Sequence, residues 1–111
     1  MPAQQPKQPQ PADVQAVQQL IQRGQLPQAE TAAQALLMQY PNTLVLYNLL
    51  GFCQQGQGKN REAVDSFRKM LAIEPHIAEV HFNLGIILTQ LGDTDDAIAS
   101  YRHSVQLKPD F

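Results

Sequence analysis

The sequence predicts an all-α fold, a right-handed superhelical α-solenoid of three helix-turn-helix units with six antiparallel helices. Its main support is a set of small, aromatic and proline residues that recur 34 positions apart. The set is Leu50, Gly51, Gly58, Ala63, Phe67 and Pro75 in one stretch, and Leu84, Gly85, Gly92, Ala97, Tyr101 and Pro109 in the next. A weaker copy lies upstream at Gly24, Ala29 and Pro41. Such a fixed period, with apolar residues at helical spacing between the breaks, is typical of a repeat solenoid.

The first third of the chain is predicted to hold a tail and one helix pair. Residues 1–11 form a disordered Pro/Gln-rich tail, because their four prolines block a helix. A first helix begins near Ala12 and stops at Gly24. A second helix has Pro27 in its first turn and stops at Tyr40, because the residue before a proline disfavours the helical region.

The other two helix pairs follow the same plan. In the middle pair, Asn60 is expected to cap the second helix with its side chain. In the last pair, the helices are expected over residues 77–91 and 95–107, with Asp93 or Thr94 as the cap between them. Because the turns hold only two to four residues, successive helices must be antiparallel neighbours.

These residues carry a resemblance to a known family. The spacing of Tyr47, Leu50 and Gly51, followed by Ala63, Phe67 and Pro75, resembles the tetratricopeptide repeat, and the copy 34 residues later, which starts at His81, does so too. The resemblance implies three tandem 34-residue repeats, like the N-terminal arrays of bacterial multidomain proteins. The predicted limits are residues 12–111 for the array, 10–43 for a degenerate repeat one, 44–77 for repeat two and 78–111 for repeat three.

The recurring small residues indicate where the two helices of a unit cross. Gly85 is expected to face Ala97 there, so that the helices approach closely, while Tyr101 fills the space beside the crossing. Unit two has the same arrangement. Unit one departs from it, with Val17 in place of the glycine and Ala33 in place of the aromatic residue, so its helices are expected to pack at a different distance.

Composition and charge exclude several classes of function. A net charge of -2 and a pI of about 5.8 argue against nucleic-acid and anionic-membrane partners, which need clustered Lys and Arg. No apolar run reaches membrane-spanning length, and the N-terminus lacks the apolar segment of a signal peptide. The lone Cys53 suits a reducing compartment, and a cytoplasmic location is expected.

Catalysis is not predicted. The chain has no Gly-rich phosphate loop, no HExxH and no Cys/His pair at motif spacing, so we expect no enzyme activity, no cofactor and no metal site. No catalytic or metal-binding role is expected for the residues whose chemistry could carry one, which are His76, His81, His103, Asp93, Asp95, Asp96 and Cys53. The histidines are interpreted as surface residues, the aspartates as helix-capping groups and the cysteine as a packed thiol.

The resemblance implies that the first helix of each unit lines a concave groove. The positions predicted to point into it are Gln15, Gln18 and Gln22, then Asn48, Phe52 and Gln55, then Glu79, Phe82, Asn83, Ile86 and Gln90, with Val14 and Leu49 beside them. Nearly all of these groove positions are apolar or carry amides, which suits the binding of a peptide or an amphipathic helix. Some members of the family use Lys and Arg in this groove to bind the C-terminal carboxylate of heat-shock chaperones, and the lack of basic residues at these positions disfavours that class of partner. The alternative, left open, is that Asn83 bridges helices and the phenylalanines are half-buried.

A second surface is predicted at the end of the array. Ile98, Tyr101, Val105 and Leu107 form an apolar stripe on the last helix that no later residue covers, and homodimerisation through it is one expectation. The function predicted is a non-catalytic protein-interaction module. Two alternatives stay open, a substrate-presenting N-terminal part of a larger glycosyltransferase or sulfotransferase, and a self-associating scaffold. The ligand's identity is not predicted.

Overall fold

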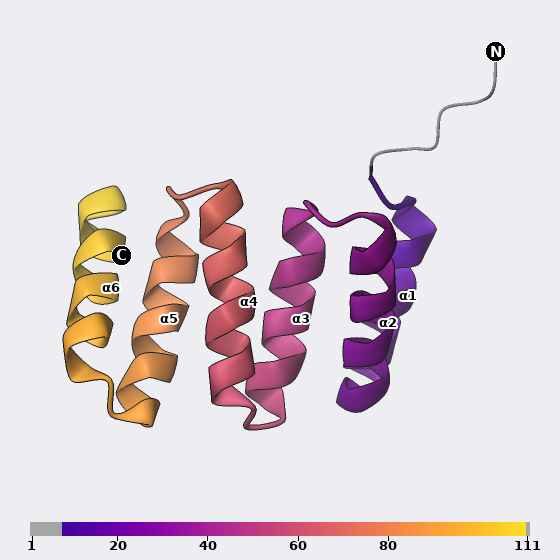
Figure 1. Ribbon diagram of the computed structural model, residues 1–111, viewed down its shortest axis with the longest axis horizontal. Helices are drawn as coiled ribbons and strands as arrows, with labels where there is room; N and C mark the ends of the chain where they lie inside the picture. Colours follow the sequence, from indigo (N-terminus) through magenta and orange to yellow (C-terminus); the bar gives the residue numbers. More distant parts are fainter. Residues whose placement is uncertain (1–7, 111) are drawn as a thin grey trace, which may run out of the picture.

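The protein is an all-α helical repeat solenoid, as predicted (Figure 1). The structure, a computed structural model, describes residues 8–110, so most of the predicted tail lies outside the described residues. These residues form six helices and no strand: α1 (Pro11–Gln22), α2 (Leu26–Gln39), α3 (Leu44–Gly56), α4 (Asn60–Ile73), α5 (Ala78–Leu91) and α6 (Thr94–Leu107). The helices stand side by side along the longest of three axes of 50 × 32 × 22 Å, so α1 and α6 lie at opposite ends.

Each unit has the same turn between its two helices. Gly24, Gly58 and Gly92 adopt the left-handed conformation, with φ of 75°, 76° and 81°. The backbone N–H of the residue after each glycine donates to the carbonyl five residues earlier, at 2.9, 2.8 and 2.9 Å. This closure satisfies carbonyls at the helix end and favours glycine, since a side chain is strained at such a φ.

The predicted side-chain caps are wrong. Asn60 is the first residue of α4 rather than its cap, and neither Lys59 nor Asp93, the residues before α4 and α6, uses its side chain as a cap. The tight glycine turn positions Lys59 and Asp93 so that their backbone carbonyls accept the first helical hydrogen bonds, from the N–H groups of Ala63 and Ala97 at 3.0 and 2.9 Å. The side chain of Lys59 is then free to reach another helix.

The helix crossing within a unit is built from a glycine and an aromatic ring. A Cβ placed on Gly51 would lie 2.8 Å from the Phe67 ring, and one on Gly85 would lie 2.5 Å from the Tyr101 ring. The glycine therefore faces the aromatic ring directly, so the nearest neighbour of Gly85 is Tyr101, whereas the expectation named Ala97. Contacts this short leave no space for a side chain unless the ring moves.

Unit one reverses the sizes of this pair. Val17 takes the place of the glycine and Ala33 that of the ring, and both are fully buried, at 1% and 0% exposed. They belong to an apolar cluster that also holds Leu50 and Cys53 of α3. A second cluster joins α4, α5 and α6. Unit one is thus packed onto unit two through a shared core, and the large residue has moved from the second helix to the first.

Candidate functional site

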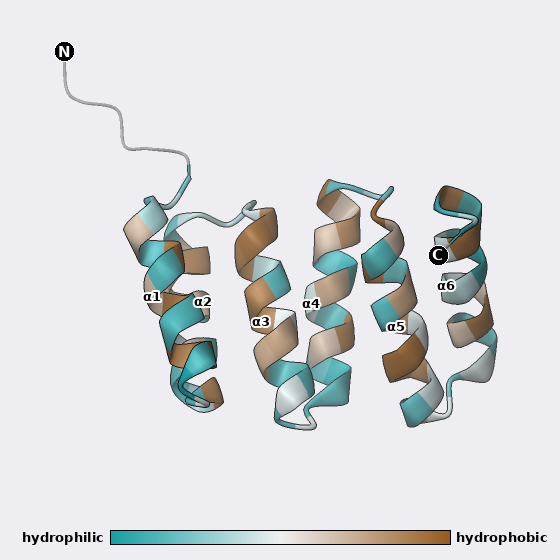
Figure 2. Ribbon diagram, turned by 180° about the vertical axis from the view of Figure 1, so that it is seen from behind, coloured by the Kyte–Doolittle hydropathy of each residue, from teal (hydrophilic) through white to brown (hydrophobic). Residues whose placement is uncertain are grey.

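The predicted groove positions lie on α1, α3 and α5, and none of them is buried. The exposed positions are Gln15, Gln18, Gln22, Asn48, Phe52, Glu79, Phe82 and Gln90. The partly buried positions are Gln55, Asn83 and Ile86. The ribbons of α3 and α5 carry broad hydrophobic segments (Figure 2). Large apolar groups therefore lie among amides on these first helices.

Five of the predicted residues line one hollow between α1 and α3. It measures about 360 Å³ and is bounded by Gln18, Gln22, Asn48, Leu49 and Phe52, together with Ile21. The Phe52 side chain is 54% exposed, which is unusual for an aromatic residue in a folded protein. The hollow is lined by both apolar side chains and amides, a combination that can hold an apolar side chain and hydrogen-bond the backbone beside it.

Two residues of this surface escaped the sequence analysis. Ile21 is not among the predicted groove positions, yet it is only partly buried and lines the hollow. Val45 is 38% exposed and lies three and seven positions before Asn48 and Phe52, which places it on the same face of α3. The 34-residue comparison points to Ile21, because Gln55, its counterpart, was assigned to the groove.

The α5 positions are partly occupied by contacts within the protein. The Phe82 ring is 37% exposed and meets the Tyr101 ring edge-to-face, with centroids 5.8 Å apart. The Gln90 amide oxygen accepts a hydrogen bond from Asn60 at 3.4 Å. The half-buried alternative left open for the phenylalanines thus fits Phe82 better than Phe52.

The candidate groove is nearly uncharged. Among its predicted residues only Glu79 is charged at neutral pH, and its carboxylate accepts a hydrogen bond from Lys108 Nζ at 3.2 Å. A hydrogen bond from its own backbone N–H, followed by the bond from Lys108, holds the pKa of Glu79 below its usual value. The surface offers no basic pair that could grip a terminal carboxylate.

The described residues bring together no catalytic or metal-binding constellation. No three His, Cys, Asp or Glu side chains between residues 8 and 110 are placed to share a metal ion. Burial, and then the nearby Glu30 charge, raise the pKa of the Cys53 thiol, which suppresses its nucleophilic form. His81 donates from Nε2 to the Pro75 carbonyl at 2.9 Å, as the Tyr47 hydroxyl donates to Pro41 in the preceding unit.

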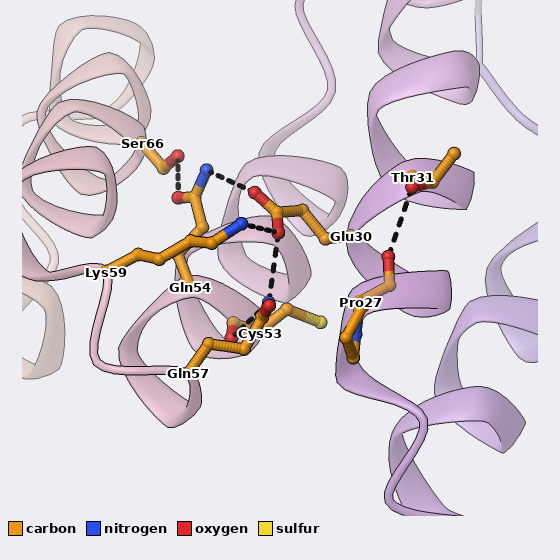
Figure 3. Close-up of polar contacts among 8 residues, drawn as sticks. All are labelled: Pro27, Glu30, Thr31, Cys53, Gln54, Gln57, Lys59 and Ser66. Atoms are coloured by element: carbon orange, nitrogen blue, oxygen red, sulfur yellow. Dashed lines mark hydrogen bonds and ion pairs between the residues drawn. The ribbon is translucent and has the colours of Figure 1, made fainter.

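A polar cluster that the sequence analysis missed ties unit one to unit two (Figure 3). The carboxylate of Glu30 on α2 has only 10% of its side chain exposed, and it accepts from Lys59 Nζ at 2.9 Å, Gln57 Nε2 at 3.0 Å and Gln54 Nε2 at 3.4 Å. The Gln54 amide oxygen in turn accepts from the Ser66 hydroxyl at 2.6 Å. These bonds link α2, α3 and α4, and α3 is one wall of the hollow.

The ionised form of Glu30 is favoured by its partners. Burial raises its pKa, but the hydrogen bonds from Lys59, Gln57 and Gln54 outweigh burial, so the pKa of Glu30 lies below its usual value. Glu30 is therefore charged at neutral pH and fully partnered within the protein.

The predicted C-terminal stripe is only partly an exposed surface. Ile98, Val105 and Leu107 are 44%, 52% and 39% exposed. Tyr101 is half-buried, which corrects the expectation of a bare ring, because it packs against Gly85 and Phe82. A hollow of about 370 Å³ is lined by Ile98, Tyr101, Arg102, Val105 and Gln106.

Comparisons with known proteins decide the family. Two family models, both described as tetratricopeptide repeat, match residues 44–77 and 78–111. The chain belongs to the tetratricopeptide repeat family. The limits of repeat one remain a prediction, as neither model matches that segment.

The curated relatives are much longer than this chain. A probable biofilm formation methyltransferase, WspC of Pseudomonas putida, is 32% identical over 74 residues, which is 67% of this chain and 18% of that protein. The human protein O-mannosyl-transferase TMTC1 is 32% identical over 91 residues, which is 78% of this chain and 10% of that protein. The similarity is therefore to a small part of each relative.

Solved structures share the fold of this tetratricopeptide array. The type III secretion translocator chaperone SycD of Yersinia enterocolitica, in complex with a peptide of the translocator YopD, superposes with a TM-score of 0.84 at 19% identity over 89% of this chain and 76% of that one. MamA gives a TM-score of 0.84 at 19% identity over 89% of this chain and 58% of that one. No helix within residues 8–110 is both long and apolar enough to cross a bilayer.

Proposed function

We propose that this chain is a non-catalytic protein-interaction module that holds a peptide or helix on the face formed by α1, α3 and α5. The observation that carries the proposal is the hollow of about 360 Å³ in which the half-exposed Phe52 ring lies beside Gln18, Gln22 and Asn48. An apolar anchor ringed by groups that both donate and accept matches the needs of a peptide, whose backbone has one donor and one acceptor per residue. The peptide-bound state of SycD, a protein of the same fold, supports it.

Peptide display against the purified chain would provide a ligand, and variants would then test where it binds. If the ring is a central anchor, Phe52→Ala should weaken binding of the selected peptide by about 2 kcal/mol, which raises the dissociation constant about thirtyfold. The matched control is Met38→Ala, since Met38 is a large apolar side chain, 88% exposed, on α2 outside this face. Affinity should change little between low and physiological salt, because the face is nearly uncharged.

Two results would contradict the proposal. The first is an unchanged affinity when Phe52→Ala is combined with Phe82→Ala. The second is a steep fall of affinity with salt, which would place the ligand on a charged surface instead.

A second candidate is supported by the lengths of the relatives. Because the chain matches a small part of a methyltransferase and of an O-mannosyl-transferase, we also propose that such an array presents substrates within a larger enzyme. The sequence analysis suggested a glycosyltransferase or sulfotransferase, and the mass of the native protein on an immunoblot would test whether a further domain exists. A cytoplasmic location remains a proposal, which cell fractionation would test.

A further inference from the structure

The outward face of α6 repeats, residue by residue, a face of α4 that is covered inside the array. Four positions on α6 match four on α4 at a spacing of 34: Ile98, Tyr101, Arg102 and Val105 correspond to Val64, Phe67, Arg68 and Leu71. The order aliphatic, aromatic, guanidinium, aliphatic is kept. We name the four α6 residues the terminal face.

Burial separates the two copies. Val64 is 5% exposed, whereas Ile98 at the same position is 44% exposed. Leu107 does not belong to the terminal face, because its counterpart inside the array, Ile73, is equally exposed at 39%. The exposure of Ile98 is thus specific to a position that a neighbouring helix covers elsewhere in this protein.

The covered copy shows what kind of helix fits. Leu88 and Leu91 of α5 lie beside Val64. On the same side, Arg68 Nη2 lies 3.6 Å from the Asp96 carboxylate, which follows soon after α5 in sequence. Arg102, the counterpart of Arg68, makes no ion pair with any residue between 8 and 110.

We propose that the terminal face binds an amphipathic helix of a partner protein, whose aliphatic stripe is spaced as in α5 and whose acidic group pairs with Arg102. The stripe to be matched is Val80, Leu84, Ile87, Leu88 and Leu91, of which the first four are buried and Leu91 is partly buried. In the partner helix, the acidic residue should lie five positions after the last aliphatic residue of the stripe, as Asp96 follows Leu91 here. The hollow of about 370 Å³ between the terminal face and Gln106 receives the aliphatic side chains.

A second copy of this chain fits the face poorly. In unit one, the positions equivalent to Val80, Leu84, Ile87, Leu88 and Leu91 are Ala12, Ala16, Gln19, Leu20 and Arg23, so Leu20 is the one large aliphatic residue, and it is partly buried while the other four are exposed. The α1 helix therefore offers neither the stripe nor the acid for a head-to-tail contact. In a two-fold contact of α6 with itself, Arg102, near the centre of the face, meets its own copy, and like charges repel there.

The chain's own residues 78–96 supply a probe of the required chemistry. A fluorescently labelled peptide of this sequence, titrated with the full chain, should bind, and Ile98→Asp should weaken it at least about tenfold. Arg102→Glu should also weaken it, and a peptide carrying Asp96→Arg should recover binding to that variant. The matched control is Ile73→Asp, an equally exposed aliphatic residue outside the face, which should leave binding unchanged.

The outcomes are distinct from those of the groove. Peptide binding that survives Ile98→Asp but is lost in Phe52→Ala would mean that the helix docks on the α1/α3/α5 face, and would overturn this inference alone. No binding of the peptide, with normal circular dichroism for every variant, would also overturn it. A concentration-dependent dimer in light scattering that Ile98→Asp abolishes would replace the partner helix by a second copy.

Discussion

The two junctions between units use opposite chemistry at equivalent positions. Between units one and two, the side chains are Glu30, Gln54, Gln57 and Lys59, joined by hydrogen bonds. Between units two and three, 34 residues on, the same positions hold Val64, Leu88, Leu91 and Asp93. One junction is thus closed by a buried carboxylate and its donors, and the other by aliphatic contact with a charged rim.

The difference teaches what each junction requires of its neighbour. Aliphatic surfaces tolerate any partner of suitable shape, whereas the buried Glu30 carboxylate is stable only beside the donors that α3 and Lys59 supply. The polar junction therefore specifies that unit two follows unit one in one register. It also ties α2 to α3, the helix that carries Asn48 and Phe52 of the hollow, which connects the candidate binding surface to this cluster.

The same contrast occurs within the units. Units two and three pair a small residue on the first helix with a ring on the second, and unit one pairs Val17 with Ala33. Packing between α1 and α2 is less extensive than between α3 and α4 or between α5 and α6. Unit one is accordingly expected to depend more on its junction than the other two units do.

The largest change in stability is expected when the sizes of the two residues at a helix crossing, such as Gly85 and Tyr101, are altered. Gly85→Val should destabilise the protein by about 3 kcal/mol, because the new side chain meets the Tyr101 ring, which must move. The double variant Gly85→Val, Tyr101→Ala recreates the sizes of Val17 and Ala33, and should cost less than the two single changes added together. Urea unfolding of the four proteins measures the coupling. Strict additivity would show that the two pairs are not equivalent.

The next effect concerns the polar junction. Gln54→Leu should cost about 2 kcal/mol, because it removes one donor from the buried Glu30 carboxylate and leaves the Ser66 hydroxyl without its acceptor. The control is the triple variant Glu30→Val, Gln54→Leu, Gln57→Leu, which copies the aliphatic junction. It should be at least as stable as the Gln54→Leu protein, since no charge stays buried. A triple variant less stable than the single one would contradict this account.

A smaller effect is expected from acid. The folded pKa of Glu30 lies below its unfolded value, so its contribution to stability is present above about pH 4.5 and is lost as the pH falls through the folded pKa. The free energy of unfolding should therefore drop more between pH 7 and pH 3.5 in the natural protein than in Glu30→Gln. Urea titrations at the two pH values give this difference. Equal decreases in the free energy of unfolding would mean that the pKa of Glu30 is the same in the folded and unfolded states.

The sequence predicts the repeat better than it predicts the polar junction, for a physical reason. Glycine, aromatic and proline positions recur because each unit needs the same crossing and the same turn, so the period is visible in Gly51 and Gly85. The partners of Glu30 lie 24, 27 and 29 residues away, and side-chain pairing at such distances leaves no periodic signal. The caps failed for a related reason, since the glycine turn alone positions Lys59 and Asp93.

The candidate surface was predictable to a similar degree. Helical spacing is sufficient to place Gln18, Asn48 and Phe52 on exposed faces, and the structure brings them to one hollow. Helical spacing alone could not show that Ile21 opens onto this hollow, although its 34-residue counterpart Gln55 pointed to it. Nor could the spacing show that the Phe82 ring is partly covered by Tyr101. Both depend on how closely neighbouring helices approach, which is a property of the packed units rather than of a single helix.

The smallest effect is expected at the ion pair of the aliphatic junction. Arg68 and Asp96 lie 3.6 Å apart with 54% and 65% of their side chains exposed, whereas Lys59 and Glu30 lie 2.9 Å apart with 46% and 10% exposed. An exposed pair gains little, since water screens the attraction and two long side chains lose freedom. Asp96→Asn should therefore change the free energy of unfolding by no more than about 0.5 kcal/mol, and Glu30→Gln by clearly more. Similar losses in the two variants, measured in the same buffer, would show that the burial of Glu30 does not distinguish the two junctions.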